Sequence, residues 1–338
     1  GAGGAVAGGW LADRIGARGA LITGLVAAPV TLGVLYVAPS LPLMVAAAVL
    51  VGVAGRIYPP AAGALIAASV TGERRTRAFS LMHWAINIGA AGAAMLAGFL
   101  AAHGYLLLFA VDALTCLIFA GIVVWGIAPS PRPARPATRA AGGYRIVLRD
   151  KLMVTFVVLM LSDEIVYSLS EFAVPLSIRL DGLTPAVFGA VAVTNAVLVV
   201  VLQPFLYPRL ARFGRMQVLG AAWVIVGIGV ASTGLAHSPI AYAATAVIWS
   251  IGEVAGGIVA GGIAADLAPA EAQGRYQGAM TWASSLARLA GPLLTTVLFA
   301  TVGPAALWWL AAVVGIVSAL ILWRLAPAFH RRLTLATP

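Results

Sequence analysis

The sequence predicts an all-α polytopic membrane protein. Of its 338 residues, 62% are hydrophobic and 9% are charged, and the mean hydropathy is +1.00. So few charged side chains cannot cover the surface of a water-soluble globule of this size. The hydrophobic residues form long continuous runs and do not alternate with polar ones, a pattern that favours membrane-spanning helices over the strands of a barrel.

Ten complete membrane spans are predicted from the polar, proline and glycine breaks between these runs. A hydrocarbon core about 30 Å thick needs about 20 residues of apolar helix to cross it. The predicted spans are 19–38, 42–67, 78–102, 105–128, 151–178, 185–207, 216–236, 240–266, 276–302 and 304–326. Residues 1–12 are also apolar, but twelve residues of helix reach only about 18 Å at about 1.5 Å per residue. The sequence therefore predicts that this first span is cut short.

The basic residues predict the orientation of the spans, because Lys and Arg gather in loops that stay in the cytoplasm. Every Lys and Arg except Arg56, Arg179 and Arg288 falls in alternate loops, at the span ends next to them or in the C-terminal tail, all on one side. We expect this side to be cytoplasmic, in a protein of the cytoplasmic membrane whose C-terminus lies inside the cell. The net charge of +10 is then a feature of topology and does not indicate nucleic-acid binding.

An internal repeat predicts two related halves. Four residues of the first half recur at one constant offset: Arg14, Gly16, Glu73 and Arg77 return as Arg212, Gly214, Glu271 and Arg275. At the same offset, Ala211 takes the position of Asp13. Parallel repeats of this kind are related by an axis along the membrane normal.

We therefore expect an N-terminal bundle in residues 1–128 and a C-terminal bundle in residues 151–338. A cytoplasmic linker in residues 129–150 would join them. Its prolines, glycines and arginines are typical of an extended, solvated segment.

Residues 9–18, Gly-Trp-Leu-Ala-Asp-Arg-Ile-Gly-Ala-Arg, place one acid and two arginines in a glycine turn between two apolar runs. This segment resembles the loop signature of the major facilitator superfamily, Gly-x-Leu-Ala-Asp-Arg-x-Gly-Arg followed by Arg or Lys, and departs from it only where Ala17 replaces a basic residue. In that family the signature lies on the cytoplasmic side between the second and third helices. The resemblance implies a membrane transporter of two pseudo-symmetric six-helix bundles. The spans would then be numbers two to twelve, with the first helix and part of the second missing.

The resemblance also implies that the signature acts as a conformational latch. A carboxylate favours the positive N-terminal end of a helix dipole. By resemblance, Asp13 would face the start of helix eleven, near Arg275. The residues expected to form this latch are Gly9, Asp13, Arg14, Gly16, Arg18 and Arg275.

Ionisable residues inside spans are the candidates for a transport site, because such a group is costly in lipid unless it faces a cavity or a partner. In helix seven, Glu164, Tyr167, Ser168 and Glu171 lie at i, i+3, i+4 and i+7 and therefore share one face. Asp163 is turned about 100° away from that face and is expected to meet a neighbouring helix. The functional interpretation is a substrate or proton face, and the alternative is a structural network that seals the two halves.

Helices four and ten supply further candidates, since by resemblance the first, fourth, seventh and tenth helices line a central cavity. Glu253 in helix ten and Arg56 in helix four occupy nearly equivalent places in the repeat. Pro59 and Pro60 should break helix four just after Arg56. The candidate cavity residues are Glu164, Glu253, Arg56, Glu171, Tyr167 and Asp163.

The two arginines inside spans have alternative interpretations. Arg56 falls near the position of an arginine that is linked to proton transfer in the family's drug/proton antiporters, and its alternative is an ion pair that fixes one conformation. Arg288 needs a partner in lipid, because a guanidinium is always charged, and it is expected to pair with Glu253 or another acid.

The favoured function is secondary active transport of small molecules by alternating access, coupled to protons and directed to drug efflux. The Gly252–Glu253 pair and the Gly274–Gly278 segment are similar to proton-driven multidrug efflux proteins, although span 78–102 lacks the proline typical of their helix five. The alternatives are a proton-coupled permease for sugars or organic ions and, from another class, a non-transporting receptor or scaffold. The expected partners are a small-molecule substrate, protons and the lipid bilayer, bound by a monomer.

The inventory of reactive residues argues against an enzyme. The single cysteine, Cys116, excludes cysteine metal clusters, and the four histidines show no ligand spacing. No phosphate-binding glycine loop is present. We therefore expect no metal, no cofactor and no nucleic-acid partner.

Overall fold

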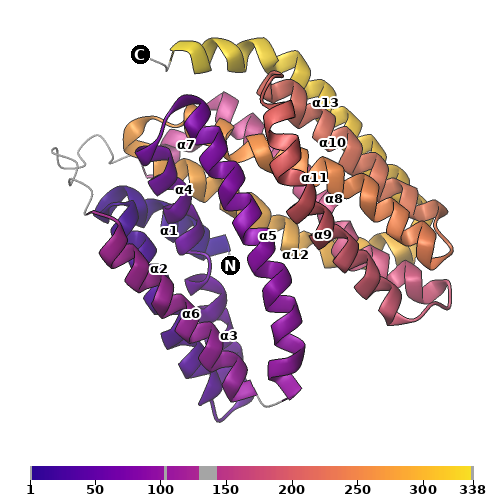
Figure 1. The fold of residues 1–338 in the computed structure, drawn as a ribbon, viewed down its shortest axis with the longest axis horizontal. Helices are drawn as coiled ribbons and strands as arrows, with labels where there is room; N and C mark the ends of the chain where they lie inside the picture. Colours follow the sequence, from indigo (N-terminus) through magenta and orange to yellow (C-terminus); the bar gives the residue numbers. More distant parts are fainter. Residues whose placement is uncertain (1, 103–104, 129–142, 336–338) are drawn as a thin grey trace. The chain divides into compact units, whose positions relative to one another are not determined.

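The computed structural model describes residues 2–102, 105–128 and 143–335, and the regular structure within these ranges is helical throughout (Figure 1). This confirms the all-α prediction. Within the described ranges, nine helical segments are long and apolar enough to cross a membrane.

The helices follow the predicted spans closely. The first part of the chain forms α1 (Ala2–Ile15), α2 (Ala17–Tyr36), α3 (Leu41–Ala54), α4 (Tyr58–Ser69), α5 (Gly72–Ala102) and α6 (Tyr105–Gly126). The second part forms α7 (Arg145–Arg149), α8 (Lys151–Leu180), α9 (Pro185–Leu210), α10 (Arg215–Ala231), α11 (Pro239–Leu267), α12 (Gln273–Thr301) and α13 (Pro304–Leu335), with short 3-10 turns η1 (Ser232–Leu235) and η2 (Ala270–Ala272).

The predicted linker divides into two parts. Residues 129–142 lie outside the described residues. The remainder differs from the expected extended and solvated segment, because residues 145–149 form the helix α7, in which Val147 is buried. Val147 lies between Arg145 and Arg149 and gives this short helix an apolar side that can be buried.

The predicted break in helix four is confirmed. A turn at residues 55–57 separates α3 from α4, and prolines occupy the first turn of α4. Proline is tolerated there because the first backbone N–H groups of a helix have no partner within it. The turn packs tightly, since a Cβ on Gly8 would collide with Ile57 and one on Gly24 would lie 2.8 Å from the amide nitrogen of Tyr58.

The chain divides into two compact units, each of which takes segments from both sequence halves. The first contains Gly1–Thr71, Gly92–Val154 and Ala264–Ser285, and the second contains Gly72–Ala91, Thr155–Ile263 and Leu286–Pro338. In the first unit, α2 packs against α3, α4 and α6 (Figure 1). Its core consists mainly of alanine and leucine side chains, which allow close helix packing.

The second unit is built around the long contact between α10 and α13 (Figure 1). Gly227 and Gly315 let these helices approach, because a Cβ on Gly227 would lie 2.9 Å from the Ala311 carbonyl oxygen. Close backbone approach through small residues is the usual means of helix association in a membrane. The rest of this core is mainly aliphatic and also contains the aromatic residues Tyr242 and Trp249.

Candidate functional site

The signature loop brings the end of α1 to the start of α12, within the first unit. The Asp13 carboxylate accepts hydrogen bonds from the backbone amides of Gly274 (2.7 Å) and Arg275 (3.0 Å) and from Nε of Arg275 (2.7 Å). The Arg275 side chain is 2% exposed and that of Asp13 is 10% exposed. Charge and helix dipole both favour a carboxylate at this position. The predicted contact between Asp13 and the helix that begins near Arg275 is present.

Two glycines of the signature have geometric roles. Gly16 has a φ of 88°, a left-handed conformation that favours glycine, and it lets α2 begin directly after α1. Gly9 faces α12, where a Cβ would collide with the Gly274 carbonyl oxygen and lie 3.0 Å from the Cα of Gly278. Glycine on both helices therefore lets the two backbones meet.

The two arginines of the signature make contacts near the same end of the unit. The Arg14 guanidinium lies 4.7 Å from the centroid of the Trp10 ring, a cation–π contact. Arg18 donates from Nη2 to the Val124 carbonyl near the end of α6, at 2.8 Å. These contacts tie the loop to α1 and α6 and leave Asp13 directed at α12.

Tyr144, which the sequence did not single out, packs into the same contact. Its hydroxyl donates to the Val6 carbonyl at 2.9 Å. It lies between two glycines, since a Cβ on Gly9 would be 2.5 Å from the Tyr144 hydroxyl oxygen and one on Gly278 would collide with it. Burial, together with the nearby Asp13 carboxylate, raises the pKa of the Tyr144 phenol, which therefore remains a donor. An aromatic residue within a Pro, Gly and Arg segment is the signal that indicates such packing.

Two residues at the start of α12 form hydrogen bonds with the end of the linker. Arg275 donates from Nη1 to the Gly143 carbonyl at 3.0 Å. Tyr276 donates from its hydroxyl to Oδ2 of Asp150 at 2.6 Å. The start of α12 thus binds both the signature loop and the last residues of the linker.

In the second unit, the start of α5 makes another contact between the two sequence halves. A Cβ on Gly261 of α11 would lie 2.5 Å from the Phe79 ring, and one on Gly257 would collide with the His83 ring. His83 Nδ1 also lies 3.0 Å from Oε1 of Gln203 on α9. Helix α5 is therefore packed into the glycines of α11 and hydrogen-bonded to α9.

Glu253 of α11 lies among neutral hydrogen-bond donors. Its Oε2 accepts a hydrogen bond from Nδ2 of Asn195 on α9 at 2.6 Å, and the Tyr167 phenol of α8 is a second donor. Asn195 also donates to the hydroxyl of Ser250, a fully buried residue. Because both of these donors are neutral, proton uptake by Glu253 leaves neither of them as an unpaired charge.

Asp163 and Glu164 lie within electrostatic range of Glu253. Asp163 faces Trp223 of α10, which agrees with the prediction that it meets a neighbouring helix. Glu171 also acts electrostatically on Glu253, so the structure gathers all four predicted cavity acids in one region of the second unit.

Glu171 is paired with a cation. Arg288 Nη1 lies 3.3 Å and 3.2 Å from its two carboxylate oxygens. The prediction that Arg288 pairs with an acid is confirmed, and that acid is Glu171. The hydroxyl of Ser168 also faces α12, since a Cβ on Gly291 would lie 2.5 Å from it. The predicted polar face of helix seven is therefore partly used in packing against α12.

Arg56 lies in the first unit, in the turn between α3 and α4, and is half-buried. Both Arg56 and Asp112 act electrostatically on the neighbouring Tyr58. Arg56 and Glu253 belong to different units, and their opposition across a cavity stays a prediction.

Comparisons with known proteins agree with this architecture. The sequence profile of the Major Facilitator Superfamily matches residues 1–173 and 164–337. The chain is similar to multidrug resistance protein MdtH of Cronobacter sakazakii, with 26% identity over 331 residues that cover 95% of this chain and 82% of that protein. The identity to MdtH of Salmonella typhimurium is 23%, with 96% and 81% covered.

Solved structures show the same fold. A double tryptophan mutant of XylE has a TM-score of 0.77 at 17% identity, with 99% of this chain and 86% of that chain covered. The human organic anion transporter MFSD10 has a TM-score of 0.73 at 15% identity, with 95% and 80% covered. XylE is described as a proton:xylose symporter, so the fold alone does not choose a substrate. The chain belongs to the Major Facilitator Superfamily of membrane transporters.

Proposed function

We propose that this transporter exports structurally diverse drugs in exchange for protons. The observation that carries the proposal is the environment of Glu253, a carboxyl group within a span that is bound by the neutral side chains of Asn195 and Tyr167. The similarity to proteins named for multidrug resistance supports efflux. We place the protein in the cytoplasmic membrane as a monomer, with its C-terminus in the cytoplasm.

Glu253 is the proton carrier in this mechanism. When protonated, it can donate to a neutral acceptor, and when ionised, it presents a negative charge to a cationic or polar drug. Proton and substrate therefore compete for one group, which is the condition for exchange. Asn195 and Tyr167 orient the carboxyl group in both states.

The other predicted cavity residues have supporting roles. Glu164 adds negative potential near Glu253 and favours cationic substrates. Asp163 faces Trp223 of α10 and connects α8 with that helix. Glu171 is neutralised by Arg288 and serves mainly to connect α8 with α12. Arg56 is the counter-charge that we expect from the other half of the protein.

The latch couples this site to the conformational cycle. Asp13 and Arg275 join α1 to α12, and alternating access requires this contact to open when the site faces the cytoplasm. Loss of the ion pair leaves the buried guanidinium of Arg275 without its carboxylate, so the state in which α1 and α12 are in contact is favoured while the pair is intact.

Everted membrane vesicles test the proposal directly. A respiration-driven acid interior should drive uptake of ethidium and of chemically unrelated antibiotics, and a protonophore should abolish it. Accumulation of sugars or organic ions, with no drug movement, would establish the permease alternative. Absence of flux for every compound in purified proteoliposomes would favour a receptor or scaffold.

A further inference from the structure

The contact between α5 and α9 is the repeat counterpart of the Asp13 latch. Arg77 of α5 corresponds to Arg275, and Ala211 at the end of α9 corresponds to Asp13. The second copy therefore keeps the cation and lacks the acid. Arg275 is 2% exposed, whereas Arg77 is exposed and lines a cavity together with Ala211.

The same repeat explains why a cavity is present there. The glycines that bring α1 and α12 together, Gly9, Gly274 and Gly278, are replaced by Tyr207, Thr76 and Ser80. Side chains at these positions prevent the close backbone contact seen between α1 and α12. The resulting cavity has a volume of about 570 Å³.

The cavity joins charged and apolar walls. Its charged side chains are those of Arg74, Arg77, Arg215 and Glu73, with the cations in excess. Its apolar wall is formed by Leu210, Phe213, Ile258 and Val259. A cavity with this lining fits an amphiphile whose polar part is anionic.

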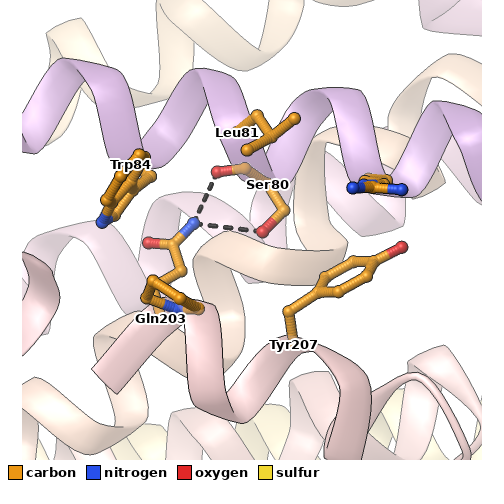
Figure 2. A pocket seen from close by; sticks show the side chains of 7 residues that line it. Ser80, Leu81, Trp84, Gln203 and Tyr207 are labelled. Atoms are coloured by element: carbon orange, nitrogen blue, oxygen red, sulfur yellow. Dashed lines mark hydrogen bonds between the residues drawn. The ribbon is translucent and has the colours of Figure 1, made fainter. Parts of the chain in front are cut away.

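A second cavity of about 230 Å³ shares Arg77 and Tyr207 with the first. It follows α5 and α9 away from their charged ends, past Leu81, Trp84 and Pro204. Figure 2 shows the Trp84 and Tyr207 rings on either side of the hydrogen bonds that Gln203 donates to Ser80. From Arg77 to Trp84 the groove rises about 10 Å along α5, at about 1.5 Å per residue.

We propose that these two adjacent cavities, which share Arg77 and Tyr207, bind an anionic phospholipid. Its phosphate takes the position of the missing carboxylate beside Arg77 and Arg74, and an acyl chain lies along the apolar side chains toward Trp84. The charged end of the site lies at the loops that the basic residues predict to be cytoplasmic. A lipid bound in this way therefore has its headgroup at the cytoplasmic surface. The lipid thereby completes the second copy of the latch from outside the chain.

The test uses the whole purified protein, delipidated and titrated with dioleoylphosphatidylglycerol or dioleoylphosphatidylcholine, with bound lipid counted by native mass spectrometry. Phosphatidylglycerol should bind more tightly than phosphatidylcholine. Arg77→Gln should weaken the binding of phosphatidylglycerol about fivefold, which is the expected effect of removing one arginine near an anionic lipid. Arg324→Gln, which removes another exposed arginine, is the matched control and should leave binding unchanged.

Ala211→Asp provides a second and independent arm, because it restores the acid of the first copy. It should displace phosphatidylglycerol and raise the melting temperature of the lipid-free protein, while the isosteric neutral change Ala211→Asn should do neither. If Arg77→Gln does not fold, this arm decides the proposal.

Three results would overturn the proposal. Equal binding of the two lipids would mean that the headgroup charge is not recognised. Equal losses of phosphatidylglycerol affinity in Arg77→Gln and Arg324→Gln would indicate a general attraction of the lipid to the basic surface. If inorganic phosphate alone raised the melting temperature of the delipidated protein as much as phosphatidylglycerol does, the site would bind an anion and not a lipid.

Discussion

At the scale of single residues, the signature is explained by contacts that each need one residue type. Gly9 allows the backbones of α1 and α12 to meet, and Gly16 supplies a left-handed φ of 88°. Asp13 binds two backbone amides and one guanidinium. The sequence predicted the partner of Asp13 through family resemblance. It did not predict the contacts of Tyr144. The single aromatic residue of the linker signals packing, but no local pattern indicates that its ring meets Gly9 and Gly278.

Gly9→Ala tests the backbone contact. The added methyl group would collide with the Gly274 carbonyl oxygen, which cannot move without shifting α12. Overpacking of this kind costs about 1–3 kcal/mol, so the melting temperature in detergent should fall. Gly3→Ala, on the same helix with open space around it, is the control and should be neutral. Equal melting temperatures for the two variants would refute the close contact.

Asp13→Asn tests the ion pair while keeping the side-chain shape. It leaves the buried Arg275 without its carboxylate. Breaking a fully buried pair costs about 3–5 kcal/mol, which is the upper bound here because the Asp13 side chain is 10% exposed. The population open to the cytoplasm should rise, as measured by distances between spin labels on α1 and α12. Arg14→Gln removes the cation–π contact with Trp10, which lies within α1, and should leave those distances unchanged. An unaltered distance distribution in Asp13→Asn would contradict a latch.

At the scale of helices, the sequence predicted which segments are helical and where helix four breaks. Length, hydropathy and proline positions are local properties, and they suffice for this purpose. Which glycine faces which neighbour depends on helix rotation and crossing, and these follow from packing. The packing of Phe79 and His83 into α11 was therefore outside the reach of the sequence.

Neighbouring glycines of α11 offer a matched test of that packing. Gly261→Ala would place a methyl group 2.5 Å from the buried Phe79 ring and should lower the melting temperature. Gly256→Ala finds its nearest atoms at 3.6 Å, an ordinary contact, and should be neutral or slightly stabilising because alanine has the higher helix propensity. The reverse order of stability would show that α5 does not pack on this face.

At the scale of the whole molecule, the sequence predicted the family and singled out the acids that lie near one another in the second unit. These acids were recognisable because ionisable residues within spans are rare. Their partners were not. Arg288 pairs with Glu171 and Glu253 is bound by Asn195 and Tyr167, and this division is set by helix positions that no spacing rule specifies. As a result, Glu171 is paired with a cation, whereas Glu253 is bound only by uncharged donors among the contacts of the described residues.

The most direct measurement compares gradient-driven transport with substrate exchange for Glu253→Gln in proteoliposomes. Glutamine keeps the hydrogen bond to Asn195 but cannot carry a proton. The variant should lose accumulation driven by a pH gradient and retain exchange of labelled for unlabelled drug, whereas Glu171→Gln should reduce both through weaker packing. Undiminished gradient-driven accumulation in Glu253→Gln would contradict the assignment of proton coupling to this residue.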